Sequence, residues 1–383
     1  MPKRAIILGS TGSIGCNALD VLAGLNGEWD VVGLAAGSRG QELGRQANRF
    51  RPQAVAIASA DLAGELEGEL SYSPQVFAGS DALRQLIDAV PFDTAFCAVV
   101  GAGGLAATIR AVELGRRIAL ASKEVVVVAG SLLMPLAKRT GATIIPVDSE
   151  HSAIFQALHA GRRADVRKVY LTASGGPFRT WSKEAMDAIT VEDALRHPTW
   201  DMGPKITIDS ATMMNKALEI VEACWLFDLR PDQIEVVVHP ESIIHSLVEF
   251  CDGSIIAQLG TPDMRTPIQY ALTYPARQPC PSPPLDLLQV RELKFHPPDC
   301  ERFPALGLGY YVARRGGTCG AVLNAANEAA VELFREGAVS FRDIARLTEK
   351  ALKEHEFKES PTLDELLAAD RWARREVTRC TAC

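Results

Sequence analysis

The sequence has few aromatic residues, no excess of basic residues and no long uninterrupted hydrophobic run. Aromatic residues make up 6% of its 383 residues, and 40 lysines and arginines stand against 47 acidic residues, a net charge of −7. A protein whose main partner is nucleic acid normally carries the opposite sign, because it must neutralise phosphates. The longest apolar stretch, residues 118–137, contains Lys123 and Glu124 and is interrupted by Gly130 and Pro135. It therefore does not predict a membrane span, and we expect neither nucleic acid nor a membrane as partner.

The cysteines follow no disulfide or metal-ligand pattern. There are nine, an odd number, and several lie inside apolar segments, as buried thiols of a reducing cytosol do. Cys380 and Cys383 alone have the C-x-x-C spacing, and we interpret this pair as a frayed tail. The first strand is expected at residues 4–8, directly after the N-terminus. We therefore expect neither a signal peptide nor a transit peptide before it. We expect a cytoplasmic protein, or a mature form that has already been trimmed.

The sequence as a whole is 47% hydrophobic and 23% charged, which is typical of a soluble globular enzyme. The length suits two or three domains. Short apolar runs alternate with helical patterns over residues 4–148. The expected strands are 4–8, 30–36, 53–58, 94–99, 117–121 and 142–147, and the expected helices are 13–23, 40–50, 80–88, 104–115 and 124–139. This alternation predicts an α/β domain with a Rossmann-like parallel sheet over residues 1–148.

The pattern changes after Asp148. Strand-like runs at 167–172, 234–238, 243–250 and 254–259 are separated by helices near 151–160 and 211–226, which predicts a central α+β catalytic domain over 149–274. Eight of the 22 prolines fall between Pro275 and Pro304, a density that helices and sheets do not tolerate. We therefore expect a linker over 275–304, followed by a small C-terminal helical domain over 305–383.

A glycine motif, Gly9-Ser-Thr-Gly12-Ser-Ile-Gly15, follows the first expected strand and opens the first expected helix. Glycines there permit a tight turn, and the helix N-terminus offers free N–H groups to a pyrophosphate. The motif predicts a dinucleotide cofactor. The same spacing occurs in short-chain dehydrogenases, but these need a Tyr-x-x-x-Lys pair, and no tyrosine here has a lysine four residues on.

The segment after the second expected strand favours NADPH over NADH. NAD-preferring domains carry an acidic residue near the end of that strand, which binds the ribose hydroxyls. Here Gly37-Ser38-Arg39-Gly40 follows with no carboxylate before Glu42. Ser38 and Arg39 can instead bind a 2′-phosphate. The alternative is that Arg39 merely points to solvent.

Three carboxylates are candidate metal ligands. Asp148 and Glu150 lie two residues apart in Val-Asp-Ser-Glu-His, and in an extended segment they point the same way. The alternative is a helix start, with Asp148 or Ser149 as N-cap and Glu150 in the first turn. Glu219 lies one helical turn after Asn215 and completes an all-oxygen set, which suits Mg²⁺ or Mn²⁺ better than Zn²⁺.

Three further motifs are candidate ligand sites. Ser122-Lys123-Glu124 lies at the carboxyl end of an expected strand, where ligands of α/β sheets gather. Ser174-Gly-Gly can direct N–H groups and a hydroxyl at a phosphate, or can be a plain turn. Residues 197–204 hold His197, Trp200 and Met202 among prolines and a glycine, which is typical of a lid.

These motifs, taken in order, closely resemble those of the 1-deoxy-D-xylulose-5-phosphate reductoisomerase family, and the resemblance covers essentially the whole chain. It implies that NADPH binds Thr11, Gly12, Ser13, Ile14, Gly37, Ser38, Arg39, Ser122, Glu124 and Gly203. It implies that the divalent metal binds Asp148, Glu150 and Glu219. It implies that the sugar phosphate contacts Lys123, Ser149, Glu150, Ser174, His197, Trp200, Ser210, Asn215, Lys216 and Glu219, with Met202 on the flap. The catalytic residues would be Lys123, Asp148, Glu150, His197 and Glu219. The chain departs from the family at Ser122, where Asn is usual, at Ala173, where Gly is usual, and at Ser38-Arg39, where Lys/Arg-Asn is common.

The activity that the resemblance implies is an NADPH- and metal-dependent rearrangement and reduction. The substrate would be 1-deoxy-D-xylulose 5-phosphate and the product 2-C-methyl-D-erythritol 4-phosphate, an isoprenoid precursor, and the family implies a homodimer. Two alternatives stay open. One is a plain NADP-dependent dehydrogenase of a small sugar phosphate, and the other is a dinucleotide-binding regulator without turnover.

Overall fold

The structure, a computed structural model, describes residues 1–25, 27–200 and 202–381. Asp201 of the predicted flap and Cys383 of the predicted terminal pair lie outside the described residues. Contacts divide the chain into two compact units. Unit 1 holds residues 1–125, 133–152 and 263–283, and unit 2 holds 126–132, 153–262 and 284–383.

Unit 1 is built on a sheet of parallel strands. The strands are β1 (Lys3–Leu8), β2 (Trp29–Ala36), β3 (Ala54–Ile57), β4 (Gln75–Ala78), β5 (Thr94–Cys97), β6 (Arg117–Leu120) and β7 (Thr143–Pro146). Their order is β4-β3-β2-β1-β5-β6-β7, and every neighbouring pair is parallel. The strand order reverses direction between β1 and β5. In such sheets, ligands bind outside the carboxyl ends of the strands at this switch point.

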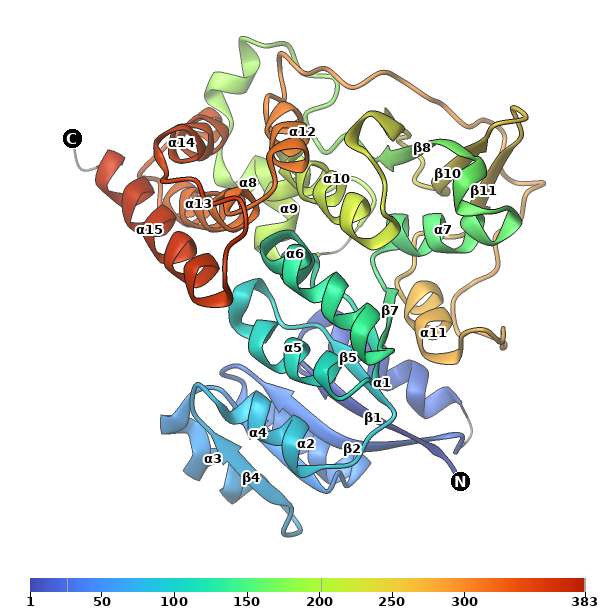
Figure 1. The fold of residues 1–383 in the computed structure, drawn as a ribbon, viewed down its shortest axis with the longest axis vertical. Helices are drawn as coiled ribbons and strands as arrows, with labels where there is room; N and C mark the ends of the chain where they lie inside the picture. The colour runs from blue at the N-terminus through green and yellow to red at the C-terminus, as the bar shows by residue number, and fades with distance from the viewer. Residues whose placement is uncertain (26, 201, 382–383) are drawn as a thin grey trace. The chain divides into compact units, whose positions relative to one another are not determined.

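Helices cover both faces of this sheet. Ile6 and Ile7 are successive residues of β1, so their side chains point to opposite faces, and both are fully buried. The helices of the alternating region are α1 (Ser13–Gly24), α2 (Gly40–Phe50), α3 (Ala63–Glu69), α4 (Ala82–Ala89), α5 (Leu105–Glu113) and α6 (Lys123–Thr140). Figure 1 shows α2, α4 and α5 beside the strands. The predicted parallel Rossmann-like sheet is confirmed.

Helix α11 (Arg265–Thr273) also belongs to unit 1, where it packs on α1. The Arg117 guanidinium donates to the Tyr274 carbonyl at 2.9 Å, and the Gln278 amide donates to Glu28 at 2.9 Å. These contacts explain why residues 263–283 group with unit 1, whereas the sequence-based division assigns them to the central domain and the linker. The functional meaning of the four-part division stays a prediction.

Unit 2 contains a mixed sheet and most of the remaining helices. Its strands β8 (Val166–Ala173), β9 (Ile234–Val238), β10 (Ile244–Phe250) and β11 (Ile255–Leu259) take the order β11-β10-β8-β9. Strand β10 is antiparallel to β8 and β11, whereas β8 and β9 are parallel. The helices are α7 (Ser149–Ala157, whose first turn lies in unit 1), α8 (Val191–Ala194), α9 (Pro204–Ala211), α10 (Met214–Phe227), α12 (Ala305–Arg315), α13 (Cys319–Arg335), α14 (Phe341–Glu354) and α15 (Leu363–Thr381).

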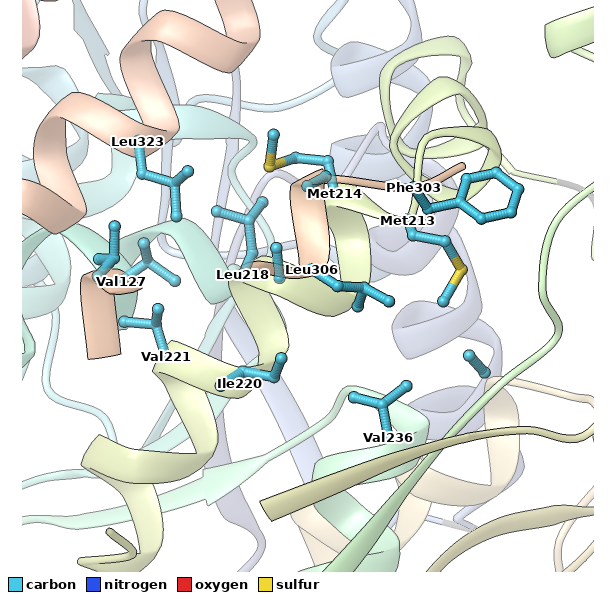
Figure 2. Close-up of a cluster of buried hydrophobic side chains, with 14 of the residues drawn as sticks. Val127, Met213, Met214, Leu218, Ile220, Val221, Val236, Phe303, Leu306 and Leu323 are labelled. Atoms are coloured by element: carbon cyan, nitrogen blue, oxygen red, sulfur yellow. The ribbon is translucent and has the colours of Figure 1, made fainter. Parts of the chain in front are cut away.

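Helix α10 runs through the core of unit 2. Met214, Leu218 and Val221 are buried on it, and Figure 2 shows them near Leu306 of α12 and Leu323 of α13. Helices α14 and α15 pack against α13 in turn (Figure 1). The core interpretation of the Met213-Met214 pair is confirmed. A helix with this much buried apolar surface is a rigid support for the polar side chains that it also carries.

No helix in the described ranges is long and apolar enough to cross a bilayer.

Candidate active site

The glycine motif forms the turn between β1 and α1, and its backbone leaves no room for side chains. Gly9 has φ +85°, and a Cβ built on it would lie 2.4 Å from the Ala98 carbonyl oxygen. A Cβ on Gly15 would lie 2.2 Å from the Gly9 oxygen. Helix α1 begins at Ser13 with Gly12 as its N-cap, and no side chain caps its first N–H groups. This turn fits a pyrophosphate, because unsatisfied N–H groups at a helix start attract anions.

Arg39 lies beside this turn. It follows β2, the neighbour of β1, and its guanidinium donates to the Thr11 carbonyl at 2.9 Å while the side chain stays exposed. The Gln46 side-chain amide of α2 donates to the Ser10 carbonyl at 2.9 Å and so helps to hold the turn in place. The structure thus brings Gly37, Ser38 and Arg39 to the same sheet edge as Thr11. Gln46 was not predicted, because nothing in a helical glutamine signals which carbonyl it will meet.

The Ser122-Lys123-Glu124 motif begins α6 directly after β6, and all three side chains are buried. The Ser122 hydroxyl donates to the Val99 carbonyl in the loop after β5. Lys123 forms an ion pair with Asp148, which follows β7. The predicted placement of the motif at the carboxyl edge of the sheet is confirmed. The ion pair joins Lys123, a candidate substrate residue, to Asp148, a candidate metal ligand.

The Asp148–Glu150 segment is helical from Ser149 onward, so the extended interpretation is wrong and the helix-start alternative is right. Ser152 donates its N–H to the Asp148 carbonyl at 2.8 Å, which closes the first turn of α7. The Ser149 hydroxyl donates to Glu150 Oε2 at 2.5 Å, and the Ser149 N–H donates to Asp148 Oδ1 at 3.1 Å. Both carboxylates therefore belong to one short segment at the end of β7.

In unit 2, Glu219 is held on α10 by two donors. The Asn215 amide donates to Glu219 Oε1 at 2.5 Å, and the Lys216 ammonium donates to Glu219 Oε2. Glu219 is fully buried and Lys216 is 3% exposed. The predicted shared face of these three residues is confirmed. Two donors fix the carboxylate rotamer before any ligand arrives.

The candidate metal ligands are divided between the units, with Asp148 and Glu150 in unit 1 and Glu219 in unit 2. All three offer carboxylate oxygens and none offers sulfur or an imidazole. This donor set fits a hard divalent cation such as Mg²⁺ or Mn²⁺.

The Ser174 turn follows β8 and contacts the end of α9. The Ser174 Oγ lies 2.9 Å from His197 Nε2, and it accepts the Gly176 N–H at 3.2 Å. A Cβ on Gly176 would lie 2.7 Å from the Ser210 carbonyl oxygen, which shows how closely the turn meets that residue. The structure therefore brings Ser174, His197 and Ser210 together within unit 2.

His197 is held as a neutral donor. Its Nδ1 accepts the N–H groups of Thr199 at 3.2 Å and Trp200 at 2.9 Å, so the neutral ring carries its proton on Nε2. That proton points at Ser174. The same two bonds hold the start of the predicted flap, where the Trp200 ring lies 6.4 Å from the His245 ring. Gly203 is the N-cap of α9.

A first prediction concerns the acid stability of the protein. Burial, with a smaller contribution from the charge of Arg179, lowers the pKa of His197 from 6.5 to about 4. Between these values the unfolded chain binds a proton that the folded chain does not, so His197 makes the free energy of unfolding fall as pH falls from about 6.5 to about 4. Urea unfolding of the wild type and of His197→Gln should show a smaller loss over this range in the variant. Parallel losses in the two proteins would contradict a neutral His197.

Comparison with known proteins identifies the family. Family models for the 1-deoxy-D-xylulose 5-phosphate reductoisomerases match residues 5–130, the C-terminal domain of the same enzymes matches 144–227, and a further DXP reductoisomerase C-terminal domain matches 259–376. The chain belongs to the 1-deoxy-D-xylulose 5-phosphate reductoisomerase family. The reductoisomerase of Exiguobacterium sibiricum is 50% identical over 376 residues, 98% of each chain. That of Heliobacterium modesticaldum is 50% identical over 381 residues, which is 99% of this chain and 97% of the relative.

Solved reductoisomerase structures share the fold over the whole chain. The enzyme of Zymomonas mobilis in complex with NADPH is 42% identical with a TM-score of 0.93, covering 100% of this chain and 99% of that one. A DOX-P reductoisomerase in complex with NADPH, fosmidomycin and magnesium is 40% identical with a TM-score of 0.93, covering 99% and 98%. These matches confirm the predicted family and fold class.

Proposed function

We propose that the chain converts 1-deoxy-D-xylulose 5-phosphate to 2-C-methyl-D-erythritol 4-phosphate, in an NADPH- and divalent-metal-dependent rearrangement and reduction. The observation that carries the proposal is the buried Glu219 carboxylate held between Asn215 and Lys216, in a chain about half identical to reductoisomerases over its full length. A buried carboxylate whose orientation is fixed by two donors is what a Lewis-acid metal site needs. The intact acidic set also argues against a regulator without turnover.

NADPH is assigned to the carboxyl edge of the unit 1 sheet. The turn after β1 would hold the diphosphate and Arg39 the 2′-phosphate, for the reasons given above. The full cofactor set is Thr11, Gly12, Ser13, Ile14, Gly37, Ser38, Arg39, Ser122, Glu124 and Gly203. A structure of a relative with NADPH supports this assignment.

The metal and substrate assignments follow the same reasoning. Asp148, Glu150 and Glu219 would hold Mg²⁺ or Mn²⁺, and a relative with bound magnesium supports the choice of cation. The phosphate would contact Ser174, His197 and Ser210, which the structure brings together. The remaining substrate residues are Lys123, Ser149, Glu150, Trp200, Asn215, Lys216 and Glu219.

The chain's own residues position the substrate and keep charges where the reaction needs them. When bound, the cation supplies Lewis-acid polarisation of substrate oxygens and NADPH supplies hydride. Lys123 and Lys216 form ion pairs with Asp148 and Glu219 in buried surroundings and so hold the two carboxylates in place. His197 donates from Nε2 without bringing a charge of its own. Binding energy from the phosphate contacts, remote from the reacting carbons, can then drive orientation and closure of the flap at 197–204.

Each of the four parts predicted from the sequence has a proposed role in this activity. Residues 1–148 would bind the cofactor, and 149–274 would bind the metal and substrate. Residues 275–304 form an extended arm with one β-bridge, from His296 to Val238. In residues 305–383, α12 and α13 pack against α10, and Figure 2 shows Leu306 and Leu323 from these two helices.

The proposal is tested with the purified protein, NADPH, 1-deoxy-D-xylulose 5-phosphate and Mg²⁺. NADPH oxidation should require the substrate and stop on addition of a chelator, and NMR should identify the branched product. A straight-chain reduced product would instead indicate a plain sugar-phosphate dehydrogenase. No oxidation under any of these conditions would indicate a regulator.

We also propose a cytoplasmic homodimer. The eight cysteines in the described part of the chain are free thiols, as a reducing compartment favours. Strand β11 is the edge of the unit 2 sheet, and Ile255, Ile256 and Leu259 on it are 38–50% exposed. An apolar open edge is a surface that a second copy can cover by pairing strand to strand.

Sedimentation equilibrium should therefore give twice the chain mass of 41.3 kDa at micromolar concentration. Ile256→Lys should shift the protein towards the monomer, because it places a charge on the covered edge. Leu288→Lys, at an apolar position that is 95% exposed and lies outside the sheet, serves as control. A wild-type monomer at these concentrations would contradict the dimer.

A further inference from the structure

Arg179 lies over the Ser174 turn in unit 2. It follows Ser174-Gly-Gly-Pro-Phe, and its guanidinium Nη1 donates to the Gly176 carbonyl at 3.4 Å. A Cβ built on Gly175 would lie 3.1 Å from Arg179 Cβ and 3.3 Å from its Cδ. The aliphatic part of the Arg179 side chain thus packs on the turn, and the guanidinium bonds to a carbonyl of the same turn.

The backbone that carries Arg179 is held in place by a second arginine. Arg302 donates to the carbonyls of Arg179 at 3.1 Å and Trp181 at 2.5 Å, and its Nε donates to Asp299 at 2.8 Å. Three carbonyl and carboxylate contacts on one guanidinium fix the loop after the turn. Arg179 therefore starts from an ordered backbone, which lowers the entropy lost when its side chain meets a ligand.

Arg179 differs from two other basic residues of unit 2, because they form ion pairs with carboxylates. Lys216 is paired with Glu219, and Lys205 with Asp209 at 2.8 Å. Across residues 1–25, 27–200 and 202–381, no acidic side chain lies within 4 Å of the Arg179 guanidinium, whose hydrogen-bond acceptor is the Gly176 carbonyl. After burial, which is the larger cause, the positive charge of Arg179 helps to lower the pKa of His197, so the guanidinium lies close to a ring that is neutral.

We propose that Arg179 recognises the phosphate group of the substrate through its charge, as a specificity-determining residue beyond the assigned phosphate contacts. The inference rests on the proposed placement of the phosphate at Ser174, His197 and Ser210. A phosphate monoester carries close to two negative charges at pH 7. The Ser174 hydroxyl and His197 Nε2–H supply hydrogen bonds without charge, and the charge of Lys216 is shared with Glu219. Among the described residues, Arg179 supplies a positive charge at the turn that no carboxylate within 4 Å compensates.

The experiment compares wild type, Arg179→Gln, Arg179→Lys, Ser174→Ala and the control Arg196→Gln. Arg196 is the residue before His197, carries the same charge and is exposed to solvent. Two quantities are measured in each protein: kcat and KM for 1-deoxy-D-xylulose 5-phosphate, and the Ki of inorganic phosphate as a competitor. Folding is checked by circular dichroism and by NADPH binding.

We expect Arg179→Gln to raise both KM and the phosphate Ki by about 10-fold or more while kcat stays within about 3-fold, since a charge-assisted contact is lost in binding. Arg179→Lys should stay within about 3-fold of wild type in both, because it keeps the charge. Arg196→Gln should change neither. If Arg179→Gln does not fold, the lysine variant decides, and a rise of more than about 10-fold in its Ki overturns recognition by charge.

Other outcomes overturn the inference in distinguishable ways. A fall in kcat at unchanged KM and Ki would make Arg179 a structural residue. An equal effect of Arg196→Gln would reduce it to general surface charge. If Ser174→Ala raises the phosphate Ki and Arg179→Gln does not, the inference fails and the phosphate placement stands. If neither variant changes the Ki, the placement itself is wrong.

Discussion

Glu219→Gln is expected to lower kcat by at least ~10²-fold, because it removes one of three anionic ligands at the moment charge develops on the substrate's oxygens. The carboxylate is fully buried and accepts from both Asn215 and Lys216. The amide that replaces it turns an N–H donor towards one of these donors. The loss should persist at saturating Mg²⁺, since the ligand is missing rather than merely weaker. The measurement is kcat as a function of metal concentration.

A matched control separates catalysis from folding in this experiment. Glu249 of β10 is also buried in unit 2 and also accepts from two donors, Tyr170 at 2.7 Å and Arg167 at 2.7 Å. Glu249→Gln should destabilise the protein without a comparable loss of kcat. Removing Glu219 leaves Lys216 buried without its counter-charge, so some loss of stability is expected there too. Near-normal turnover of Glu219→Gln at saturating metal would refute the three-carboxylate assignment.

Much of the unit 1 fold follows from the sequence, because a parallel sheet buried on both faces needs continuous apolar strands. Strands β1, β2 and β5 are such runs, and all were predicted. Helix α3 and strand β4 were not. Strand β4 is an edge strand whose side chains stay partly exposed, and α3 is rich in glutamate and glycine, so neither shows the expected apolar pattern. The strand order, with its reversal between β1 and β5, rests on contacts far apart in the sequence.

The local backbone of the site was harder to predict than its residues. The helix expected near 211–226 is confirmed as α10 except at its start, where Met213 with φ +61° separates it from α9, which was not predicted. No sequence pattern demands a left-handed methionine, and the burial of its side chain must stabilise it. Arg179 was missed for a related reason. A basic residue after a Ser-Gly-Gly turn is a signal, but only the structure shows that it has no acidic neighbour.

The cofactor preference gives the last prediction, and it rests on Arg39. The guanidinium donates to the Thr11 carbonyl at 2.9 Å, so Arg39 does not simply point to solvent. That contact holds a positive charge at the carboxyl edge between β1 and β2, and no carboxylate precedes Glu42 in the loop. A charge-assisted bond to a 2′-phosphate contributes roughly 1.5–3 kcal/mol, about 10–150-fold in preference, which an uncharged ribose does not provide.

Arg39→Ala should therefore erase most of the preference for NADPH over NADH, mainly by raising KM for NADPH. KM for NADH should change little, because NADH lacks the 2′-phosphate that Arg39 would bind. Arg45→Ala is the control, since Arg45 lies on α2, the helix that begins directly after Arg39, is exposed and pairs with Glu42 at 2.6 Å. Comparing kcat/KM for the two cofactors in all three proteins isolates the 2′-phosphate. If the NADPH/NADH ratio of Arg39→Ala equals that of wild type, another residue binds the 2′-phosphate, and the bond to Thr11 serves only to join the two loops.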